Sequence, residues 1–474
     1  MTTRDPASKP VAPPGPPESP IVSRREFVEQ TSMAGMAFTI VKPHVLGARG
    51  GRHVAPSDTV NIACIGVGGM GQSDVRGLGA TTGCNIYALC DVDEVAAERS
   101  YRAQPLAKHY KDYREMIDKE AKNIDLVTVS TPDHHHAAAS MLALRAGKHL
   151  YCQKPLARTV AEVRALKAES AKRPKQATQM GNQGHAAEGT RLIREWVEAG
   201  LIGKVTAVDF YTNRPIWPQG IKRPSEAHNV PPTLDWDLWL GPAPFRPYHP
   251  AYAPFNWRGW WDYGTGAMGD MACHIMDASV WTLGLKFPGR VIPETSQLFA
   301  ETAPKTSRIT YEFPVFGTMN AVGRNGTLTL TWRDGGILPA RPEGWPATEN
   351  WPYSDDGFQM WMGEKGTILA GTYGESPRLV DAEADKAVKA TPVPVKYART
   401  RGVYGELIDA IKNGTQPGSN IAGHAGPLTE MIVLGNLAVR AGRAIDLNPT
   451  TGELLTKGIN EEWITPRYRS GYSY

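Results

Sequence analysis

The amino-acid sequence predicts an α/β protein with an N-terminal, doubly wound parallel sheet and a C-terminal α/β domain built on an antiparallel sheet. In the N-terminal part, short apolar strands alternate with helical segments and short loops, which is typical of parallel sheets with helices on both faces. Further along, runs such as 309–313 and 328–332 alternate apolar and polar residues, which indicates antiparallel strands with one buried face. Helices are expected at 403–412 and 427–441.

The composition is that of an ordinary globular protein. Its 474 residues include 52 Lys and Arg against 48 Asp and Glu, for a net charge of +4, and 41% are hydrophobic. These values exclude collagen, a coiled-coil rod and a chain disordered throughout, and the length suggests two or three domains. There is no broad basic surface and no apolar run of about 18 residues, so neither nucleic acid binding nor a membrane span is expected. The five scattered cysteines match neither a disulfide framework nor a zinc site.

Residues 1–54 are predicted to form a disordered segment followed by an export signal and a linker. Residues 1–20 contain seven prolines and few apolar side chains, which is typical of disorder. The segment Ser-Arg-Arg-Glu-Phe at 23–27, followed by a short, weakly apolar stretch at 31–41, resembles a twin-arginine signal with a cleavage region at 45–48. The signal predicts a periplasmic protein that is exported after folding. If this segment is instead an amphipathic surface helix, the protein is cytoplasmic.

A glycine-rich loop follows the first predicted strand, at 60–65. The loop, Gly-Val-Gly-Gly-Met-Gly at 66–71, stands where a strand should end and a helix begin. Gly66 permits the tight turn, Gly68 lets the backbone approach a pyrophosphate, and Gly71 permits close packing of helix on strand. The helix N-terminus would offer free N–H groups to the phosphates. We expect this loop to bind a dinucleotide through Gly66, Gly68, Gly69, Met70 and Gly71.

An acidic residue ends the second predicted strand, at 85–90. Asp91 follows Gly71 by twenty residues, the position at which a carboxylate accepts hydrogen bonds from the adenosine ribose hydroxyls. The same charge repels a 2′-phosphate, and no arginine follows immediately, so NAD is preferred over NADP as the cofactor. A second role for Asp91, as a turn or capping residue before 94–99, is compatible with the first.

Two further loops follow strands of the same predicted sheet. They are Thr-Pro-Asp-His-His-His at 131–136 and Gln-Lys-Pro at 153–155. Ligands of such sheets bind beyond the carboxyl ends of the strands, where both loops should lie. Three consecutive histidines cannot all point at one ion without unusual backbone geometry, so no metal site is expected.

The glycine loop, the histidine-rich segment and the Lys-Pro pair, in this order, resemble the glucose–fructose oxidoreductase and inositol dehydrogenase (Gfo/Idh/MocA) family over most of residues 58–285. The resemblance implies an NAD-binding Rossmann domain at 55–175. It also implies a C-terminal α/β domain at 176–474, whose open, mostly antiparallel sheet carries the substrate face. A homo-oligomer, either a dimer or a tetramer, is expected on the same ground. The further cofactor contacts that it implies are Thr131, Pro132, His134, His136, Lys154, Pro155 and Gln183.

Lys154 is the first catalytic candidate. Most lysines are solvated surface charges, but this one follows an apolar strand and precedes a proline. The family motif is Glu-Lys-Pro, and its lysine lies near the nicotinamide and the reacting carbon. Here Gln153 stands in the first position, which removes a carboxylate and so disfavours a protonated lysine.

Aromatic residues gather in a long predicted insertion at 213–262, which is rich in Trp, Pro and Arg. Long irregular loops in compact domains are uncommon and often functional, and indole rings stack well on the C–H faces of sugars. The alternative is that the rings pack a core. We expect the substrate to contact Trp260 and Tyr263, together with His185 of the polar loop at 181–185. The tryptophans of the insertion are Trp236, Trp239, Trp257, Trp260 and Trp261.

Asp270 and His274 stand four residues apart at the start of a predicted helix, so both project from one face. The purely structural interpretation is that Asp270 caps the helix and that His274 packs in the core. The resemblance instead implies that this Asp-x-x-x-His is the catalytic pair that acts with Lys154. Asp277, one turn beyond, is expected to support the site or to be structural.

These residue types suit the oxidation of a secondary alcohol. His274 is the favoured general base, Lys154 would stabilise the developing alkoxide, and Asp270 would position Lys154 or the substrate. Lys154 could itself be the base if it is neutral. The predicted function is therefore NAD-dependent oxidation of a sugar, cyclitol or glycoside. The alternatives are a glycoside hydrolase or lyase that uses bound NAD transiently, and a non-catalytic sugar or NAD sensor.

Overall fold

The computed structural model describes residues 48–49, 52–53, 58–317 and 319–474. The twin-arginine signal predicted at 23–41 lies outside the described residues. Strands β1 (Ala48–Arg49) and β2 (Arg52–His53) pair in an antiparallel ladder within one unit of the chain, and residue 58 begins a second compact unit that continues to residue 474. Among the helices that the structure describes, none is both long enough and apolar enough to cross a bilayer.

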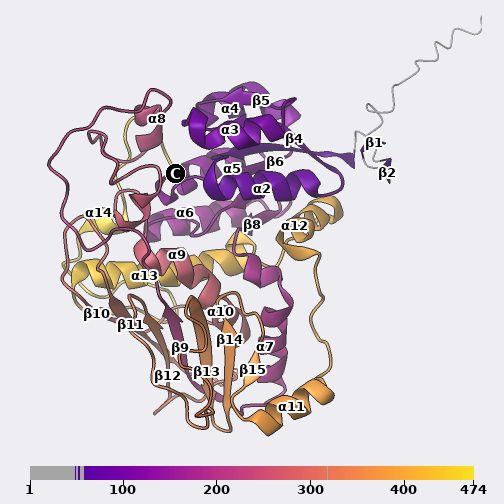
Figure 1. The fold of residues 1–474 in the computed structure, drawn as a ribbon, viewed down its shortest axis with the longest axis vertical. Helices are drawn as coiled ribbons and strands as arrows, with labels where there is room; N and C mark the ends of the chain where they lie inside the picture. The colour runs from indigo at the N-terminus through magenta and orange to yellow at the C-terminus, as the bar shows by residue number, and fades with distance from the viewer. Residues whose placement is uncertain (1–47, 50–51, 54–57, 318) are drawn as a thin grey trace, which may run out of the picture. The chain divides into compact units, whose positions relative to one another are not determined.

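Within the second unit, the first sheet has six parallel strands in the order β5-β4-β3-β6-β7-β8 (Figure 1). This confirms the predicted doubly wound sheet. Its strands are β3 (Val60–Ile65), β4 (Cys84–Cys90), β5 (Lys108–Tyr110), β6 (Leu126–Val129), β7 (His149–Cys152) and β8 (Thr178–Met180). Its helices are α2 (Gly69–Ala80), α3 (Glu94–Ala103), α4 (Tyr113–Glu120), α5 (Asp133–Arg145) and α6 (Val160–Ala171), with the short turn η2 (Ala121–Asn123).

Local sequence explains where these elements begin. All four residues of β6 are buried, as expected for a central parallel strand that is covered on both faces. Asp93 caps α3 by accepting hydrogen bonds from two backbone amides of its first turn, and Thr159 and Glu162 form a reciprocal capping box on α6. Each strand therefore passes into its helix through a short loop at the same edge of the sheet.

The second sheet of this unit has eight strands in the order β15-β14-β13-β9-β12-β11-β10-β16. Only the β9–β12 pair is parallel, so the sheet is mixed and mostly antiparallel. In β11, buried side chains alternate with half-buried ones, as the sequence predicted. The strands are β9 (Val205–Thr212), β10 (Arg290–Thr295), β11 (Ser307–Pro314), β12 (Thr327–Arg333), β13 (Gly357–Gly363), β14 (Thr367–Gly371), β15 (Arg378–Leu379) and β16 (Ile445–Asp446).

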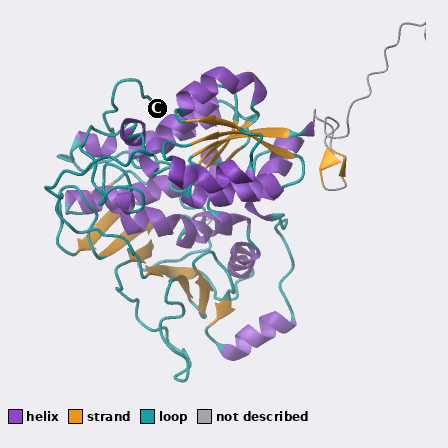
Figure 2. Cartoon of the chain, turned by 45° about the horizontal axis from the view of Figure 1, so that its top comes forward, coloured by secondary structure: helices purple, strands orange, loops and turns teal. Residues whose placement is uncertain are grey.

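Helix α13 joins the two sheets. It packs against α6 of the first domain on one side and against α9 and β10 of the second domain on the other (Figures 1 and 2). Helices α12 and α13 match the predictions at 403–412 and 427–441. The helical segments of this part are η3 (Gln183–Ala186), α7 (Glu188–Glu198), α8 (Trp236–Leu240), η4 (Asn256–Gly259), α9 (Gly266–Ile275), α10 (Asp277–Leu283), α11 (Ala382–Ala390), α12 (Gly402–Asn413), η5 (Ile421–Ala425), α13 (Gly426–Ala441) and α14 (Glu461–Ile464).

The boundary between the domains differs from the predicted one after residue 175. Strand β8 pairs with β7 at the edge of the first sheet, so that sheet continues to Met180. The first domain also receives a distant segment, because Leu407 and Ile408 of α12 are buried in the same apolar cluster as Ile62 and Leu78. The chain therefore returns to the first domain after completing most of the second.

Candidate active site

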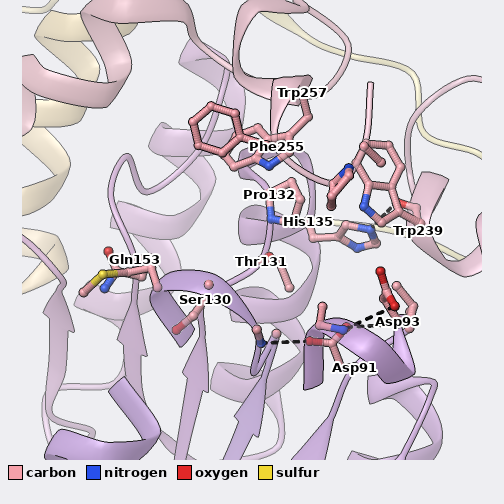
Figure 3. Close-up of a pocket in the computed structure, with 18 of the residues that line it drawn as sticks. Asp91, Asp93, Ser130, Thr131, Pro132, His135, Gln153, Trp239, Phe255 and Trp257 are labelled. Atoms are coloured by element: carbon pink, nitrogen blue, oxygen red, sulfur yellow. Dashed lines mark hydrogen bonds between the residues drawn. The ribbon is translucent and has the colours of Figure 1, made fainter. Parts of the chain in front are cut away.

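A cavity of about 690 Å³ lies at the carboxyl ends of the strands of the first sheet. It is bordered by the loops after β3, β4, β6 and β7, by the 213–262 insertion, by α9 and by Tyr373, and Figure 3 shows part of this lining. Strand β3 has β4 on one side and β6 on the other, so the cavity lies where the strand order reverses, the usual ligand site of such sheets.

The glycine loop forms one wall of this cavity. Gly66 adopts φ +75°, and a Cβ atom there would lie 2.7 Å from the carbonyl oxygen of Ser130. A Cβ atom on Gly71 would lie 1.9 Å from the carbonyl oxygen of Gly66, so Gly71 serves the close packing of α2 and does not line the cavity. Helix α2 begins at Gly69 with no side-chain cap and no acidic residue in its first turn. Its free amides suit a pyrophosphate.

Asp91 stands at the end of β4, beside the glycine loop. Its carboxylate accepts hydrogen bonds from the backbone amides of Val67 (2.8 Å), Gly68 (3.2 Å) and Asp93 (3.0 Å). Burial raises the pKa of Asp91, and these three bonds act in the opposite direction. Because Asp91 and Asp93 both line the cavity, the residues present fit a ribose with free hydroxyls and disfavour a 2′-phosphate.

The histidine-rich loop places its three rings differently from the prediction. His135 lines the cavity, whereas His134 and His136 do not. Helix α5 begins at Asp133, and successive side chains on a helix point about 100° apart, so one ring of the three faces the cavity. The predicted contact of His134 and His136 with the cofactor is therefore corrected.

His136 instead holds the two loops of the site together. Its Nδ1 atom lies 2.6 Å from the carbonyl oxygen of Pro155, and its Nε2 atom lies 2.9 Å from that of Thr131. Both contacts require a ring N–H, so the ring is an imidazolium. Burial disfavours that charge, but the neighbouring Cys152 and Asp133 and the Pro155 carbonyl raise the pKa of His136 to about 9. Pro155 itself acts through this bond and does not line the cavity.

The three predicted catalytic residues meet at one end of the cavity. Lys154 Nζ lies 2.8 Å from Asp270 Oδ1 and 2.9 Å from the Asp270 carbonyl oxygen. Although burial alone would raise the pKa of Asp270, the charges of Lys154 and Arg258 hold it well below its usual range. His274, one turn further along α9, also lines the cavity.

His274 is a buried, neutral histidine. Burial first, and then the positive charge of Lys154, lower its pKa to about 3. Its Nδ1 atom is buried without a hydrogen-bond partner, and its ring meets that of Tyr373 edge-on at 4.9 Å between centroids. The neutral imidazole keeps a free nitrogen lone pair that can face a hydroxyl group, while its lowered pKa weakens it as a base.

Three residues of this site were not predicted from the sequence. Arg258 Nε lies 3.1 Å from Asp270 Oδ1, and Arg258 Nη1 lies 3.1 Å from Asp133 Oδ1, so the guanidinium bridges carboxylates of two helices, α9 and α5. Tyr373, from the turn after β14, borders the cavity beside His274. No local pattern marks Asp133, Arg258 or Tyr373, because each is recruited by long-range packing.

Gln153, which departs from the family motif, has a carboxylate as its partner. Its Nε2 atom donates to both oxygens of Asp74, at 3.0 and 3.2 Å. Asp74 is fully buried on α2, and it also accepts hydrogen bonds from Ser130 (2.7 Å) and Tyr404 (2.8 Å). Burial raises the pKa of Asp74. A carboxyl group is thus present beside position 153, on Asp74.

The predicted substrate contacts of the insertion are corrected in part. Trp260 and Tyr263 are fully buried in an aromatic cluster and do not line the cavity. Trp260 donates its indole N–H to the carbonyl oxygen of Ala251, within the insertion. The rings of the insertion that line the cavity are those of Trp217, Trp239, Tyr248, Phe255 and Trp257. The insertion therefore both packs a small core and presents aromatic rings to the site.

His185 also lies outside the cavity lining, whereas Gln183 of the same loop borders it. Asp277 accepts hydrogen bonds from His185 Nδ1 (3.0 Å), His424 Nε2 (2.6 Å) and Asn182 Nδ2 (2.8 Å). These two histidines and Asp277 are close enough to hold a metal ion. Their facing atoms are already paired with one another, which accounts for the cluster as a buried structural network and corrects the expected role of His185.

Comparison with known proteins identifies the family. Residues 60–181 match the NAD-binding Rossmann fold of the Gfo/Idh/MocA oxidoreductases, and residues 190–325 match the C-terminal alpha/beta domain of the same family. Together these ranges span more than half of the chain. The chain belongs to the Gfo/Idh/MocA oxidoreductase family. The predicted Rossmann fold is confirmed, and NAD is the cofactor of this family domain.

Curated relatives within the family differ in activity. A glycosyl hydrolase family 109 protein of Solibacter usitatus is 29% identical over 196 residues, which are 39% of this chain and 44% of that protein. An inositol 2-dehydrogenase of Salmonella paratyphi B is 28% identical over 148 residues, which are 31% of this chain and 44% of that protein. The chain thus spans less than half of the length of these relatives.

Solved structures show the same fold. A levoglucosan dehydrogenase in complex with NADH and L-sorbose matches with a TM-score of 0.55 and 18% identity, and the match covers 82% of this chain and 99% of that one. An aldose-aldose oxidoreductase from Caulobacter crescentus matches with a TM-score of 0.53 and 17% identity, covering 82% of this chain and all of the other. At this identity the likeness establishes the fold alone.

Proposed function

We propose that this chain oxidises a secondary hydroxyl group of a sugar, cyclitol or glycoside, with NAD as the hydride acceptor. The observation that carries the proposal is that the Lys154–Asp270 ion pair and a neutral His274, whose Nδ1 atom has no hydrogen-bond partner, line the same cavity as Asp91. In a Rossmann domain the adenosine half of NAD lies beside the acidic residue of the second strand, so the nicotinamide would lie near these three residues.

The residues that would hold the cofactor are Gly66, Gly68, Gly69 and Met70 of the glycine loop together with Asp91, Thr131, Pro132 and Gln183, all of which border the cavity. When bound, NAD supplies the acceptor for the hydride that leaves the substrate carbon. The protein must then orient the alcohol and take up the hydroxyl proton.

Each catalytic side chain has one task in this proposal. His274 accepts the hydroxyl proton at its ring nitrogen. Lys154 donates a hydrogen bond to the same oxygen and so stabilises the developing alkoxide, and Asp270 fixes the Lys154 ammonium in place. Because Lys154 is engaged in an ion pair, it acts as a donor, which favours His274 as the base. Trp217 and Trp257 border the site and limit the access of water.

Replacement of His274 tests this assignment. His274→Ala should abolish turnover of sugar substrates while leaving NADH binding intact, which fluorescence titration would measure separately from activity. His228→Ala is the matched control, because His228 is an exposed histidine of the insertion and should leave both properties unchanged. Turnover by His274→Ala at the wild-type rate would show that another group is the base.

A second candidate, redox-neutral cleavage of a glycoside, is favoured by the similarity to the family 109 glycosyl hydrolase. In that reaction a hydroxyl is oxidised, the neighbouring C–H becomes acidic, the glycosidic bond is eliminated, and the hydride returns to the substrate. Stoichiometric bound NAD with glycoside cleavage and no net NADH would support it. Net NADH formation on a free sugar would support simple dehydrogenation.

The sensor alternative has less support. A protein that only binds sugar or NAD has no need for Lys154, Asp270 and His274 together, yet all three border this cavity. The absence of both turnover and bound NAD on a panel of sugars and glycosides would favour it.

A further inference from the structure

The 213–262 insertion is tied by its backbone to the part of the first domain that should receive the adenosine of NAD. The amide of Glu94 donates to the carbonyl oxygen of Thr233 at 3.1 Å, and the amide of Asp235 donates to that of Val92 at 2.9 Å. Between these bonds, Asp93 and Leu234 form an antiparallel bridge. The insertion therefore continues the edge of the cavity directly beside Asp91.

The side chains at this end of the cavity form an apolar slot. Trp239 is fixed there because its ring stacks on Trp236 with 4.7 Å between centroids and 15° between planes. The ribose hydroxyls would meet Asp91, so the next group along the cofactor, the flat adenine ring, would lie in this slot. The residues of the cavity lining that we assign to this slot are Val92, Leu234, Leu238, Trp239, Tyr248 and His135, and the charged Asp93, Lys111 and Asp112 line the same cavity.

Residues near the C-terminus contact both the insertion and the first domain. The backbone amide of Arg469 donates to the carbonyl oxygen of Pro242 at 3.1 Å, and its guanidinium pairs with Asp237 of α8. Arg114 of α4 donates to the carbonyl oxygen of Gly471 at 3.2 Å. In Figure 1 the C-terminal end of the chain is marked beside α8. The segment thus contacts both the insertion and the first domain.

An aromatic contact completes the attachment. The guanidinium of Arg114 lies 4.3 Å from the ring centroid of Tyr472, in the geometry of a cation–π interaction. The same ring meets His135, which lines the slot, edge-on at 6.4 Å. Because Asp237 is largely exposed, its ion pair with Arg469 contributes little alone, and the attachment depends on the whole set of contacts.

We propose that the insertion supplies an adenine pocket and that residues 469–472 act as its latch, so that NAD is retained through many turnovers rather than exchanged after each one. The inference rests on the proposed function only in taking NAD as the ligand. A retained cofactor suits the redox-neutral cleavage of glycosides, in which the hydride returns to the substrate. It also suits a protein that is loaded before export.

The release rate of NADH tests the latch directly. The full chain is loaded with NADH and then mixed with a large excess of NAD⁺, and the fall in bound-nicotinamide fluorescence gives the dissociation rate. The double variant Arg469→Ala/Tyr472→Ala should release NADH about tenfold faster. This is the change in rate expected when the ion pair with Asp237 and the cation–π contact with Arg114 are both removed. Arg467→Ala is the matched control, since Arg467 is 87% exposed and contacts Glu462 of the neighbouring helix α14.

A second pair of variants separates loss of the latch from loss of the fold. Tyr472→Phe keeps the ring and should release NADH at the wild-type rate, whereas Tyr472→Leu keeps the bulk without the π face and should release it faster. Equal release rates for the wild-type, Tyr472→Leu and double-variant chains would overturn the inference.

The same assay distinguishes this inference from the proposed function, because no sugar is present. Slow NADH release that depends on Tyr472, in a chain that turns over no sugar or glycoside, would support the latch and contradict the proposed function. A wild-type chain that binds no NADH would contradict both.

Discussion

Position 153 shows how a change in a motif can be matched by a distant residue. Gln153 donates to both oxygens of Asp74, so the pair keeps a single negative charge in a buried place where Ser130 and Tyr404 also donate. The sequence showed the loss of the motif glutamate but gave no sign of its partner, since the two residues are 79 positions apart. Their relation is visible only in the folded structure, where Asp74 of α2 meets the residue that follows β7.

Gln153→Glu should destabilise the fold by about 1–3 kcal/mol, because it places two buried carboxylates in contact and removes a donor from Asp74. One of the carboxyl groups would then have its pKa raised above the unfolded value. The penalty should therefore grow as the pH rises through that folded-state pKa. Urea unfolding between pH 5 and 8 measures the effect.

The matched control for that change is the exchanged pair Asp74→Asn/Gln153→Glu, which restores one carboxylate and one amide. It should recover most of the lost stability. A double variant no more stable than Gln153→Glu would contradict the charge-exchange explanation.

The lowered pKa of His274 predicts an unusual pH profile. Because its folded-state pKa is about 3, the ring stays neutral at pH values where a free histidine becomes charged. The value of kcat/KM should therefore show no decline with an apparent pKa near 6.5 as the pH falls from 8 to 5. As the pH falls, His274 is protonated in the unfolded chain, with a pKa of about 6.5, before it is protonated in the folded chain. His274 should therefore make the fold less stable as the pH falls through about 6.5.

A pH profile of kcat/KM for the wild-type chain, beside urea unfolding at each pH, checks both statements. A decline of kcat/KM below about pH 6.5 would show that His274 is solvated and becomes protonated in the working enzyme. The His228→Ala chain serves as the control for titration of an exposed ring.

Among single residues, sequence reasoning worked where a helical or strand period gave the direction of a side chain. Asp270 and His274 share one face of α9, as their spacing predicted, and Lys154 meets Asp270. The structure places His135 rather than His134 and His136 in the cavity lining, which the sequence did not reveal because helix α5 begins at Asp133. Arg258 was missed because its loop has no period at all.

At the scale of elements, the strands with clear patterns were predicted well. The apolar run that became β3 and the alternating run that became β11 each have the predicted type and surroundings. The two-residue strands β15 and β16 leave no pattern in the sequence. The parallel pairing of β9 with β12 joins segments more than one hundred residues apart, and local propensity does not encode such a partner.

The insertion illustrates a further limit of composition. Its aromatic residues were expected either to stack on sugars or to pack a core, and different rings do different things. Trp260 is wholly buried, whereas Trp257 borders the cavity and lies 4.2 Å from the Arg258 guanidinium. Both side chains are tryptophan, so only their positions on the folded loop distinguish them.

For the whole molecule, the sequence predicted a parallel sheet followed by a mostly antiparallel one, and a nucleotide site on the first. It did not predict where the first domain ends and the second begins. The predicted boundary after residue 175 placed β8 in the wrong sheet, because a three-residue strand carries too little pattern to show its partner. The predicted homo-oligomer stays a prediction.

The twin-arginine pair predicts the destination of the protein. We propose that the chain is exported to the periplasm, so Arg24→Lys/Arg25→Lys should leave it in the cytoplasm with its cofactor bound. Cell fractionation and immunoblotting measure the distribution. Arg4→Lys, in the proline-rich segment, is the control, and equal distribution of all three chains between the two compartments would contradict the export signal.

Helix α12 has a consequence for the order of assembly. Its buried residues Leu407 and Ile408 complete the apolar core beneath β3 and α2, more than three hundred positions upstream. A growing polypeptide that has left the ribosome as far as residue 300 would therefore lack the part of this apolar core that α12 contributes. The first domain should therefore reach its full stability only after α12 has been synthesised and has packed against it.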